Sequence, residues 1–396
     1  MRFERAYVPL GCSWSSPFAR WQGPLAEISS LDLAVDVTRR ALRERGVGPE
    51  TLDRVVLGWT VPQEGGFYGT PTFAARIGAP DITGPMISQA CATSVACLQA
   101  AAAGLESGEQ GVTLVVAADR TSNGPLLLYP SPSAQGGAPR SEHWIFDNFR
   151  RDPWAGEAMV TTAENVAREA GITREEQDEV TLLRYTQYER SLADDRAFQR
   201  RYMVPAEVRI GRSEPVCVEG DTGITSTSKE ALAKLKPVDA NGTVTYGSQT
   251  HPADGTAGLL LADESRAREL GQGSGVARVL ATGVARVGKA LMPKAPVPAA
   301  QLALEDAGLT FWDIHAVTTH NPFAVNDAYF ARQTGFPLDR MNQYGCSLVY
   351  GHPQGPTGLR AIAELIETLR LRGGGLGLFT GCAAGDTGAA LVLRVE

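Results

Sequence analysis

Apolar residues follow two alternating patterns along the chain, and each pattern predicts a different element. Residues 31–45 carry apolar side chains at helical spacing and are followed by Gly46, which is typical of an amphipathic helix. A short apolar run follows at 54–58, and residues 112–118 (VTLVVAA) form a longer one. Such a run indicates a strand that is buried on both faces of a sheet. Helices that alternate with buried strands predict an α/β fold.

The order of elements in the first part of the chain recurs near its end. Residues 298–308 form a predicted helix that ends at a glycine, as the first helix does. We therefore predict two similar α/β halves, one of residues 1–120 together with 250–265 and one of residues 266–396. The matching elements of the second half are a helix at 357–372 and strands at 376–380 and 389–395.

Residues 121–249 interrupt the first half and differ from it in composition. Residues 123–139 are rich in Pro, Gly and Ser, whereas residues 164–200 carry the charged pattern of solvated helices. A long insertion that begins beside a buried strand is typical of a lid or a binding loop. The alternative is a solvated helical decoration that has no part in the site.

Composition and charge restrict the classes of function. The chain has 396 residues, of which 43% are hydrophobic and 20% charged, as in ordinary globular proteins. Its 37 basic and 44 acidic residues give a net charge of -7, which argues against a general nucleic-acid binder. No apolar run approaches the roughly 20 residues that span a bilayer, so we expect no membrane span. Six scattered cysteines without paired spacing predict neither a zinc site nor a disulfide framework, and we expect a reducing, cytoplasmic setting.

Three residues in small-residue turns are the candidates for chemistry. Cys91 leads into an alanine-rich helix, whose unpaired N–H groups and positive dipole end favour a thiolate over a thiol. His352 lies in the equivalent turn of the second half, among glycines that allow a ligand to approach the backbone. Cys382 lies between the last two strands, and strand ends are where open α/β sheets bind ligands. If the halves pack about a pseudo-twofold axis, Cys91 and His352 face each other.

The motifs around these residues resemble those of the thiolases, and the likeness covers almost the whole chain. Residues 89–94 (QACATS) are similar to the thiolase nucleophile motif, although the family more often has Gly after Cys. Residues 351–358 (GHPQGPTG) resemble the GHPxGxxG motif, and residues 381–388 (GCAAGDTG) resemble the closing CxGGGxG. The resemblance implies the thiolase fold: two βαβαβαββ halves in α-β-α-β-α layers, with an inserted loop domain at 121–249 that serves CoA binding.

The resemblance also implies an activity, the reversible Claisen condensation and thiolysis of acyl-CoA thioesters. Cys91 would attack the thioester and hold the acyl group covalently, which divides one hard transfer into two easier steps. His352 would take the Cys91 proton and later help to hold negative charge. Cys382 would remove the α-proton of a second acyl-CoA. The backbone N–H groups of Cys91 and Ala384 would form one oxyanion site, and His352 with a group near His320 would form the other.

Further expectations concern the substrate path and the partners. Relatives line the pantetheine or acyl path at the positions of Met159, Thr250 and Phe323. No metal and no redox cofactor is needed, because a thioester already acidifies its α-carbon; the substrates are the coenzyme A thioesters themselves. The family implies a homodimer or a homotetramer.

Three departures from the family pattern affect the candidate site. Residues 320–323 (HNPF) replace the common Asn-Glu-x-Phe, which is similar to the sterol-carrier-protein and archaeal branches. His320 would orient the catalytic water or contact the oxyanion itself. Ala384 and its neighbour replace two glycines, so we expect a tighter second oxyanion hole. A basic residue that usually meets the CoA phosphate is replaced by Ile224, and the candidates to take its role are Lys229, Arg150 and Arg151.

Two other functions stay open from the sequence. A decarboxylating condensing enzyme of the ketosynthase type is a close alternative, although that branch usually has His or Asn where this chain has Cys382. A thiolase-fold subunit that binds acyl-CoA or a partner enzyme without catalysis is the other, because fold alone does not fix function. A serine hydrolase is disfavoured, since the chain has no GxSxG motif.

Overall fold

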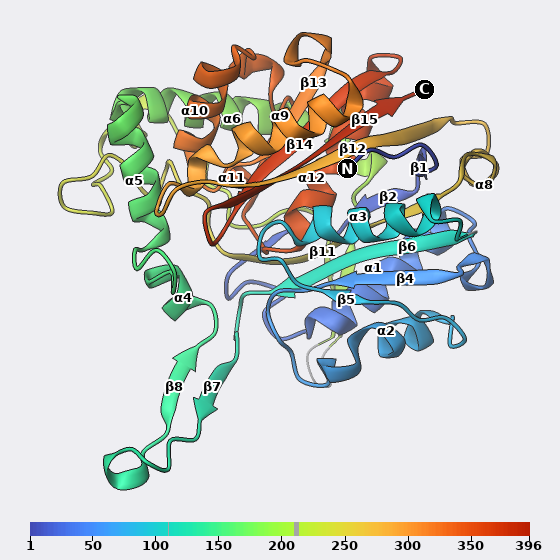
Figure 1. The fold of residues 1–396 in the computed structure, drawn as a ribbon, viewed down its shortest axis with the longest axis horizontal. Helices are drawn as coiled ribbons and strands as arrows, with labels where there is room; N and C mark the ends of the chain where they lie inside the picture. Colours follow the sequence, from blue (N-terminus) through green and yellow to red (C-terminus); the bar gives the residue numbers. More distant parts are fainter. Residues whose placement is uncertain (110, 210–213) are drawn as a thin grey trace.

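One large mixed sheet organises the structure, which is a computed structural model that describes residues 1–109, 111–209 and 214–396 (Figure 1). The short β1 (Tyr7–Pro9) joins two parts of this sheet, because it pairs with β11 (Ala253–Ala262) on one side and β12 (Val276–Arg286) on the other. Two further short strands, β2 (Ser13–Ser15) and β3 (Ala19–Arg20), pair with β11. From one edge to the other the strands are β13 (Ala316–His320), β14 (Gly375–Ala383), β15 (Thr387–Val395), β12 (Val276–Arg286), β1 (Tyr7–Pro9), β11 (Ala253–Ala262), β6 (Val112–Arg120), β4 (Arg54–Gly58) and β5 (Met86–Ile87).

Two helices, α3 (Thr93–Glu106) and α12 (Pro356–Leu371), fill the space between the two parts of the sheet (Figure 1). Their apolar side chains pack with one face of β4, β6 and β11 and with one face of β12, β14 and β15. Alternation along the strands decides which side chains join this central layer, since successive residues point to opposite faces. Leu259 and Leu261 face α3 and α12, whereas Leu260 between them faces the opposite side of the sheet.

The outer faces of the sheet are covered by helices as well. Helices α1 (Ser30–Glu44) and α2 (Gly69–Ile77) pack on the first part, and α9 (Pro296–Ala307) and α10 (Ala324–Thr334) pack on the second. The layers therefore run α-β-α-β-α, as the family resemblance implied. Helices α8 (Glu264–Leu270) and α11 (Ser347–Tyr350) belong to the connections.

The second half differs from the first at one strand. In the first half, β5 precedes α3; at the equivalent place in the second half the described chain forms only a single bridge between Val317 and Met341. The residue after Met341 explains the difference. Asn342 uses its side chain to accept from the N–H of Thr319, at 2.8 Å, where further strand pairing would otherwise continue. The division of the chain at residues 120, 250 and 266 stays a prediction.

The segment 121–249 leaves the sheet after β6 and returns at β11, and these two strands are direct neighbours. It begins with an arm, the hairpin of β7 (Leu126–Tyr129) and β8 (Arg140–His143), which projects away from the body (Figure 1). Its other elements are α4 (Phe146–Arg150), α5 (Met159–Ala170), α6 (Arg174–Arg196), β9 (Ala206–Val208), β10 (Val216–Val218) and α7 (Lys229–Ala233).

Two buried ion pairs fix this segment to the second half. Arg360 of α12 donates both terminal nitrogens to Asp221 at 2.6 and 2.8 Å, and its guanidinium lies 3.6 Å from the ring centroid of Tyr350. Arg184 of α6 donates to Asp327 of α10 at 2.8 Å. Buried charges are stable only when they are paired and hydrogen-bonded, so these contacts hold the inserted helices in one position.

No helix in the described ranges combines the length and the apolar character that crossing a membrane requires.

Candidate active site

Cys91 lies in a tight turn between β5 and α3. The residue before it, Ala90, has a left-handed backbone with φ of 45°, which is uncommon for a residue with a Cβ. The first residue of α3 holds this turn: the Thr93 hydroxyl accepts the N–H of Gln89 at 2.8 Å and donates to the carbonyl of Ala90 at 2.7 Å. The sulfur of Cys91 is thus presented at the entrance of α3.

His352 lies beside this sulfur, in the loop that leads into α12. Its Nε2 is 3.1 Å from Cys91 Sγ, and its Nδ1 is 2.7 Å from the hydroxyl of Thr357 in the first turn of α12. The backbone N–H of His352 donates to the carbonyl of His251 at 2.9 Å, which fixes the loop. The structure therefore brings together the two residues that the sequence placed in equivalent turns. Thr357 was not singled out from the sequence, although it lies within the quoted motif.

His320 and Cys382 reach the same place from the ends of two neighbouring strands. Strands β13 and β14 are parallel, and their register aligns His320 with Gly381, the residue before Cys382. The ring of His320 stacks on that of His352 with the centroids 4.0 Å apart. The Nδ1 of His320 is 3.0 Å from the hydroxyl of Ser347, while its buried Nε2 has no hydrogen-bond partner among the described residues.

The ionisable groups of the site are largely uncharged at neutral pH. Burial raises the pKa of Cys91 to about 12, although the backbone N–H groups of Ala384 and of Cys91 itself lower it. Burial lowers the pKa of His320 to about 3, and burial together with His320 holds the pKa of His352 well below its usual range. Burial, with Cys91 nearby, also raises the pKa of Cys382. The expected preference for a Cys91 thiolate is reversed, because desolvation outweighs the stabilisation that these N–H groups give to the thiolate.

A buried carboxyl group holds the loop that carries His352 by hydrogen bonds. Asp119, at the end of β6, accepts the N–H groups of Thr60, Val61 and Gly355 at 2.7 to 2.9 Å. Burial raises its pKa to about 7, although these three N–H groups lower it. The contact to Gly355 ties the end of β6 to the loop that carries His352.

A cavity of about 410 Å³ opens at Cys91 and is lined by all eight residues that the sequence predicted for catalysis and for the substrate path, but not by the phosphate candidates Lys229 and Arg151. Its wall is mostly apolar, and Phe146, Phe149 and Tyr246 of the inserted segment were not predicted. Arg150 also reaches this wall. Thr250 and Phe323 are held close together, since the N–H of Thr250 donates to the carbonyl of Pro322 at 2.7 Å. The predicted residues along the wall are Cys91, Met159, Thr250, His320, Phe323, His352, Cys382 and Ala384.

The same residues could be considered as metal ligands. Cys91, His320 and His352 offer three ligand atoms that lie within 4.8 Å of one another. The two imidazole rings, however, are stacked at 26° from parallel, so their lone pairs run side by side and do not converge on one point. A tetrahedral zinc site needs converging ligands, and this arrangement therefore favours proton transfer over metal binding.

Comparison with known families agrees with this geometry. Residues 13–265 match the family model for the N-terminal domain of thiolase, and residues 274–395 match the model for its C-terminal domain. The chain belongs to the thiolase family. It is an acyltransferase of the thiolase type.

Individual relatives span nearly the whole chain. The thiolase is 30% identical to an acetyl-CoA acetyltransferase of Escherichia coli (strain K12), with 94% of this chain and 95% of the relative covered. It is also 30% identical to a 3-ketoacyl-CoA thiolase of Serratia proteamaculans (strain 568), with 96% and 95% covered.

Solved structures show the same correspondence. The human mitochondrial 3-ketoacyl-CoA thiolase in complex with CoA matches with a TM-score of 0.90 at 25% identity, covering 100% of this chain and 99% of that one. The acetyl-CoA acetyltransferase of Bacillus anthracis matches with a TM-score of 0.91 at 27% identity, covering both chains completely.

The uncharged state of the Cys91–His352 pair predicts a distinctive pH dependence of alkylation. Because only the thiolate reacts and the pKa of Cys91 is raised, the rate of carbamidomethylation by iodoacetamide should rise about tenfold per pH unit between pH 7 and 9. Intact-mass kinetics measure this rate, and a Cys91→Ala variant corrects for the exposed Cys217. A rate that is constant between pH 6 and 8 would show a thiolate–imidazolium pair and contradict the assignment.

Proposed function

We propose that this thiolase catalyses the reversible Claisen condensation and thiolysis of acyl-CoA thioesters, with the acyl group carried on Cys91. The observation that carries the proposal is the contact of 3.1 Å between Cys91 Sγ and His352 Nε2, in one cavity with Cys382. A nucleophile, a base within hydrogen-bond reach and a second acid–base group are the parts that this reaction needs.

In the first half-reaction, His352 Nε2 accepts the Cys91 proton while the sulfur attacks the thioester carbonyl carbon. The oxyanion forms beside the N–H groups of Cys91 and Ala384, which support negative charge at this point. The bond from the carbonyl carbon to the CoA sulfur then breaks, and the leaving sulfur takes a proton from Cys382. Cys91 now carries the acyl group, His352 is protonated and Cys382 is a thiolate.

In the second half-reaction, the Cys382 thiolate removes the α-proton of a second acyl-CoA. His352, as an imidazolium, and His320 face the developing enolate oxygen. The α-carbon attacks the acyl group, the bond to Cys91 breaks, and Cys91 recovers its proton from His352. All three groups return to their initial state, so the cycle needs no metal and no redox cofactor.

Acylation and proton exchange can be measured separately. Mixing with acetyl-CoA should give an acyl adduct that intact-mass analysis detects in the wild type and not in Cys91→Ala. Exchange of the acetyl-CoA methyl protons with deuterated water should fall by about 10² to 10⁴ in Cys382→Ser, because its general base is lost.

Two outcomes would contradict this assignment. Binding of acetyl-CoA without an adduct in the wild type would indicate a non-catalytic acyl-CoA-binding subunit. Condensation that requires malonyl-CoA would indicate an enzyme of the ketosynthase type.

We further propose that Arg150 contacts a phosphate group of CoA. Arg150 lies on the wall of the cavity that holds Cys91, whereas Arg151 lies on a separate depression together with Tyr129 and Glu142. Ile224, which stands where relatives have a basic residue, packs instead against the apolar cluster around Phe323. Arg150 is therefore the positively charged side chain that a ligand in this cavity would contact.

Removal of the Arg150 side chain should weaken CoA binding without slowing the chemistry. Arg150→Ala should raise KM for acetyl-CoA about tenfold with kcat nearly unchanged, since a charge-assisted hydrogen bond is lost equally in ground and transition states. Arg151→Ala is the matched control. An acetyl thioester of N-acetylcysteamine, which has no phosphate, should react equally with both variants. If Arg150→Ala loses as much activity with this substrate as with acetyl-CoA, then Arg150 does not act through a phosphate group.

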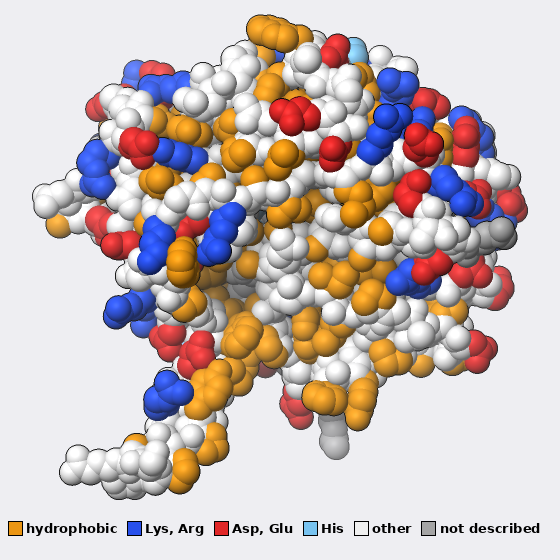
Figure 2. Space-filling model, in the orientation of Figure 1, with side chains coloured by type: hydrophobic (Ala, Val, Ile, Leu, Met, Phe, Trp, Pro, Cys, Tyr) orange, Lys and Arg blue, Asp and Glu red, His pale blue; other side chains and the backbone are white. Residues whose placement is uncertain are grey.

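We also propose that the thiolase self-associates through the projecting hairpin. Leu126 and Leu128 are each 64% exposed on this arm, and Figure 2 shows hydrophobic side chains along it. A two-stranded hairpin is marginally stable alone in water, so an arm of this kind gains stability by packing against another surface. In a homodimer or a homotetramer, the surface that the arm packs against belongs to a second copy of the chain.

Sedimentation equilibrium tests this interface. Leu126→Asp combined with Leu128→Asp should reduce the assembled mass, because charges replace the apolar contact. Leu371→Asp, which changes a leucine that is 52% exposed at the end of α12, is the control and should leave the mass unchanged. A monomeric wild type would refute the proposal.

We assign the protein to lipid metabolism in a cytoplasmic, reducing compartment. Its six cysteines are all unpaired, and the proposed chemistry requires two of them as free thiols.

A further inference from the structure

The sulfur of Cys382 has a defined hydrogen-bond donor. Cys382 is buried at the end of β14, where burial opposes the charged form of its thiol. Among the described residues, the side chain that donates to its sulfur is Asn326, whose Nδ2 lies 3.2 Å from Sγ. Asn326 belongs to none of the motifs that identify the family, and the sequence gives no reason to single it out.

The orientation of the Asn326 amide is fixed by a second contact. Asn326 is the third residue of α10, and its Oδ1 accepts the backbone N–H of Phe323 at 3.2 Å as a cap of this helix. An amide has one acceptor end and one donor end. Since the acceptor end faces the Phe323 N–H, the donor end must face Cys382.

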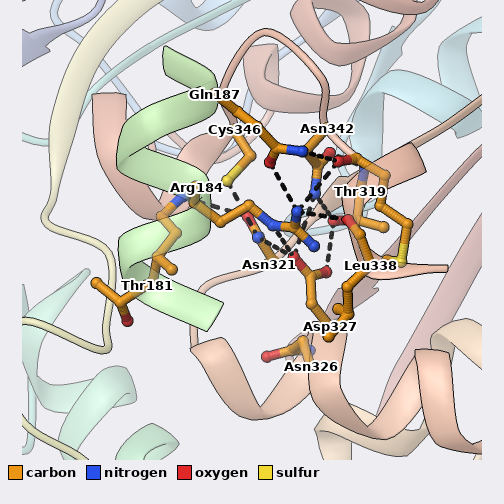
Figure 3. A network of polar contacts seen from close by, with 12 residues as sticks. Thr181, Arg184, Gln187, Thr319, Asn321, Asn326, Asp327, Leu338, Asn342 and Cys346 are labelled. Atoms are coloured by element: carbon orange, nitrogen blue, oxygen red, sulfur yellow. Dashed lines mark hydrogen bonds and ion pairs between the residues drawn. The ribbon is translucent and has the colours of Figure 1, made fainter. Parts of the chain in front are cut away.

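The turn that carries Asn326 is anchored on its other side. The next residue, Asp327, accepts Arg184 Nε at 2.8 Å, Asn321 Nδ2 at 2.6 Å and the Thr319 hydroxyl at 2.7 Å. Figure 3 shows Asp327 turned into this network, while the side chain of Asn326 lies outside it. Asp327 and Arg184 are at most 1% exposed, so the first turn of α10 has little freedom to shift.

We propose that Asn326 is a positioning residue that holds the Cys382 sulfur and stabilises its thiolate during α-proton transfer. The inference rests on the proposed function of Cys382. A hydrogen bond to a charged sulfur is stronger than one to a neutral thiol, so the amide favours the thiolate over the thiol. Asn326 makes no contact with Cys91 in the described hydrogen-bond network, so its effect should reach the reaction only through Cys382.

The Asn326→Asp variant separates the sulfur contact from the helix cap. An aspartate still accepts the Phe323 N–H, but it turns an oxygen in place of an N–H donor toward Cys382. Exchange of the α-protons of acetyl-CoA should fall roughly 10- to 100-fold, the loss expected for a hydrogen bond to a charged group. Its pH profile should move to higher pH, because a less stabilised thiolate forms only at lower proton concentration. Alkylation of Cys91 by iodoacetamide, a reaction in which Cys382 takes no part, should stay within about twofold of the wild type.

Two further variants distinguish positioning from general disorder. Asn326→Ala removes the sulfur contact and the cap together, so exchange should fall again with some loss of thermal stability. Asn342→Ala loosens the Asp327 network without touching Cys382, since Asn342 contacts Thr319 and Asp327. It should lower Cys91 alkylation and exchange in parallel and leave the pH profile of exchange in place.

These measurements distinguish a failure of the proposal for Asn326 from a failure of the proposed function. If the wild type shows neither adduct nor exchange, the function proposed for Cys91 and Cys382 is wrong. If the wild type shows both and Asn326→Asp exchanges normally, or loses Cys91 alkylation in proportion to exchange, then only the role of Asn326 is refuted.

Discussion

The close contact between the first turns of α3 and α12 is the constraint on which the site depends. Gly358 allows it, because a Cβ at this position would lie only 2.7 Å from the Cβ of Ser94. Ser94 bonds across the contact in both directions: it donates to the carbonyl of Gly355 and accepts the N–H of Leu359 at 2.8 Å. The buried central layer presses the two helices together, and the residues that precede them, Cys91 and His352, therefore meet.

A second constraint acts from outside the layers. The inserted segment forms much of the cavity wall, yet its covalent connections to the sheet are at its two ends alone, after β6 and before β11. Two arginines compensate for this, since Arg360 pairs with Asp221 and Arg184 pairs with Asp327, all of them buried. Breaking such a pair leaves an uncompensated charge and costs about 3–5 kcal/mol. The wall is thus coupled to α10 and α12, the helices that position Cys382 and His352.

The sequence was sufficient for features that depend on local patterns and on motif residues at strand ends. The strand at 54–58 has the predicted limits, and the eight predicted site residues share one cavity. His320 and Cys382 meet there because the parallel strands β13 and β14 end at one edge of the sheet. Contacts that depend on side-chain direction could not be predicted: Thr357 against His352, Ser347 against His320 and Asn326 against Cys382. The missing strand before α12 also escaped prediction, since Asn342 replaces it with a tertiary hydrogen bond.

The stacked histidines explain why the resting site is uncharged. Two imidazoles with centroids 4.0 Å apart cannot both become imidazolium ions without strong repulsion. Burial lowers the pKa of both rings, and His320 lowers that of His352 further. His352 can therefore be charged only while a negative group lies beside it, as when Cys382 becomes a thiolate or an enolate forms. A proton thus moves to His352 when the reaction creates a negative charge beside it. Burial keeps the groups neutral in the empty site, and the same burial strengthens the attraction between the imidazolium and the negative charge once substrate fills the cavity.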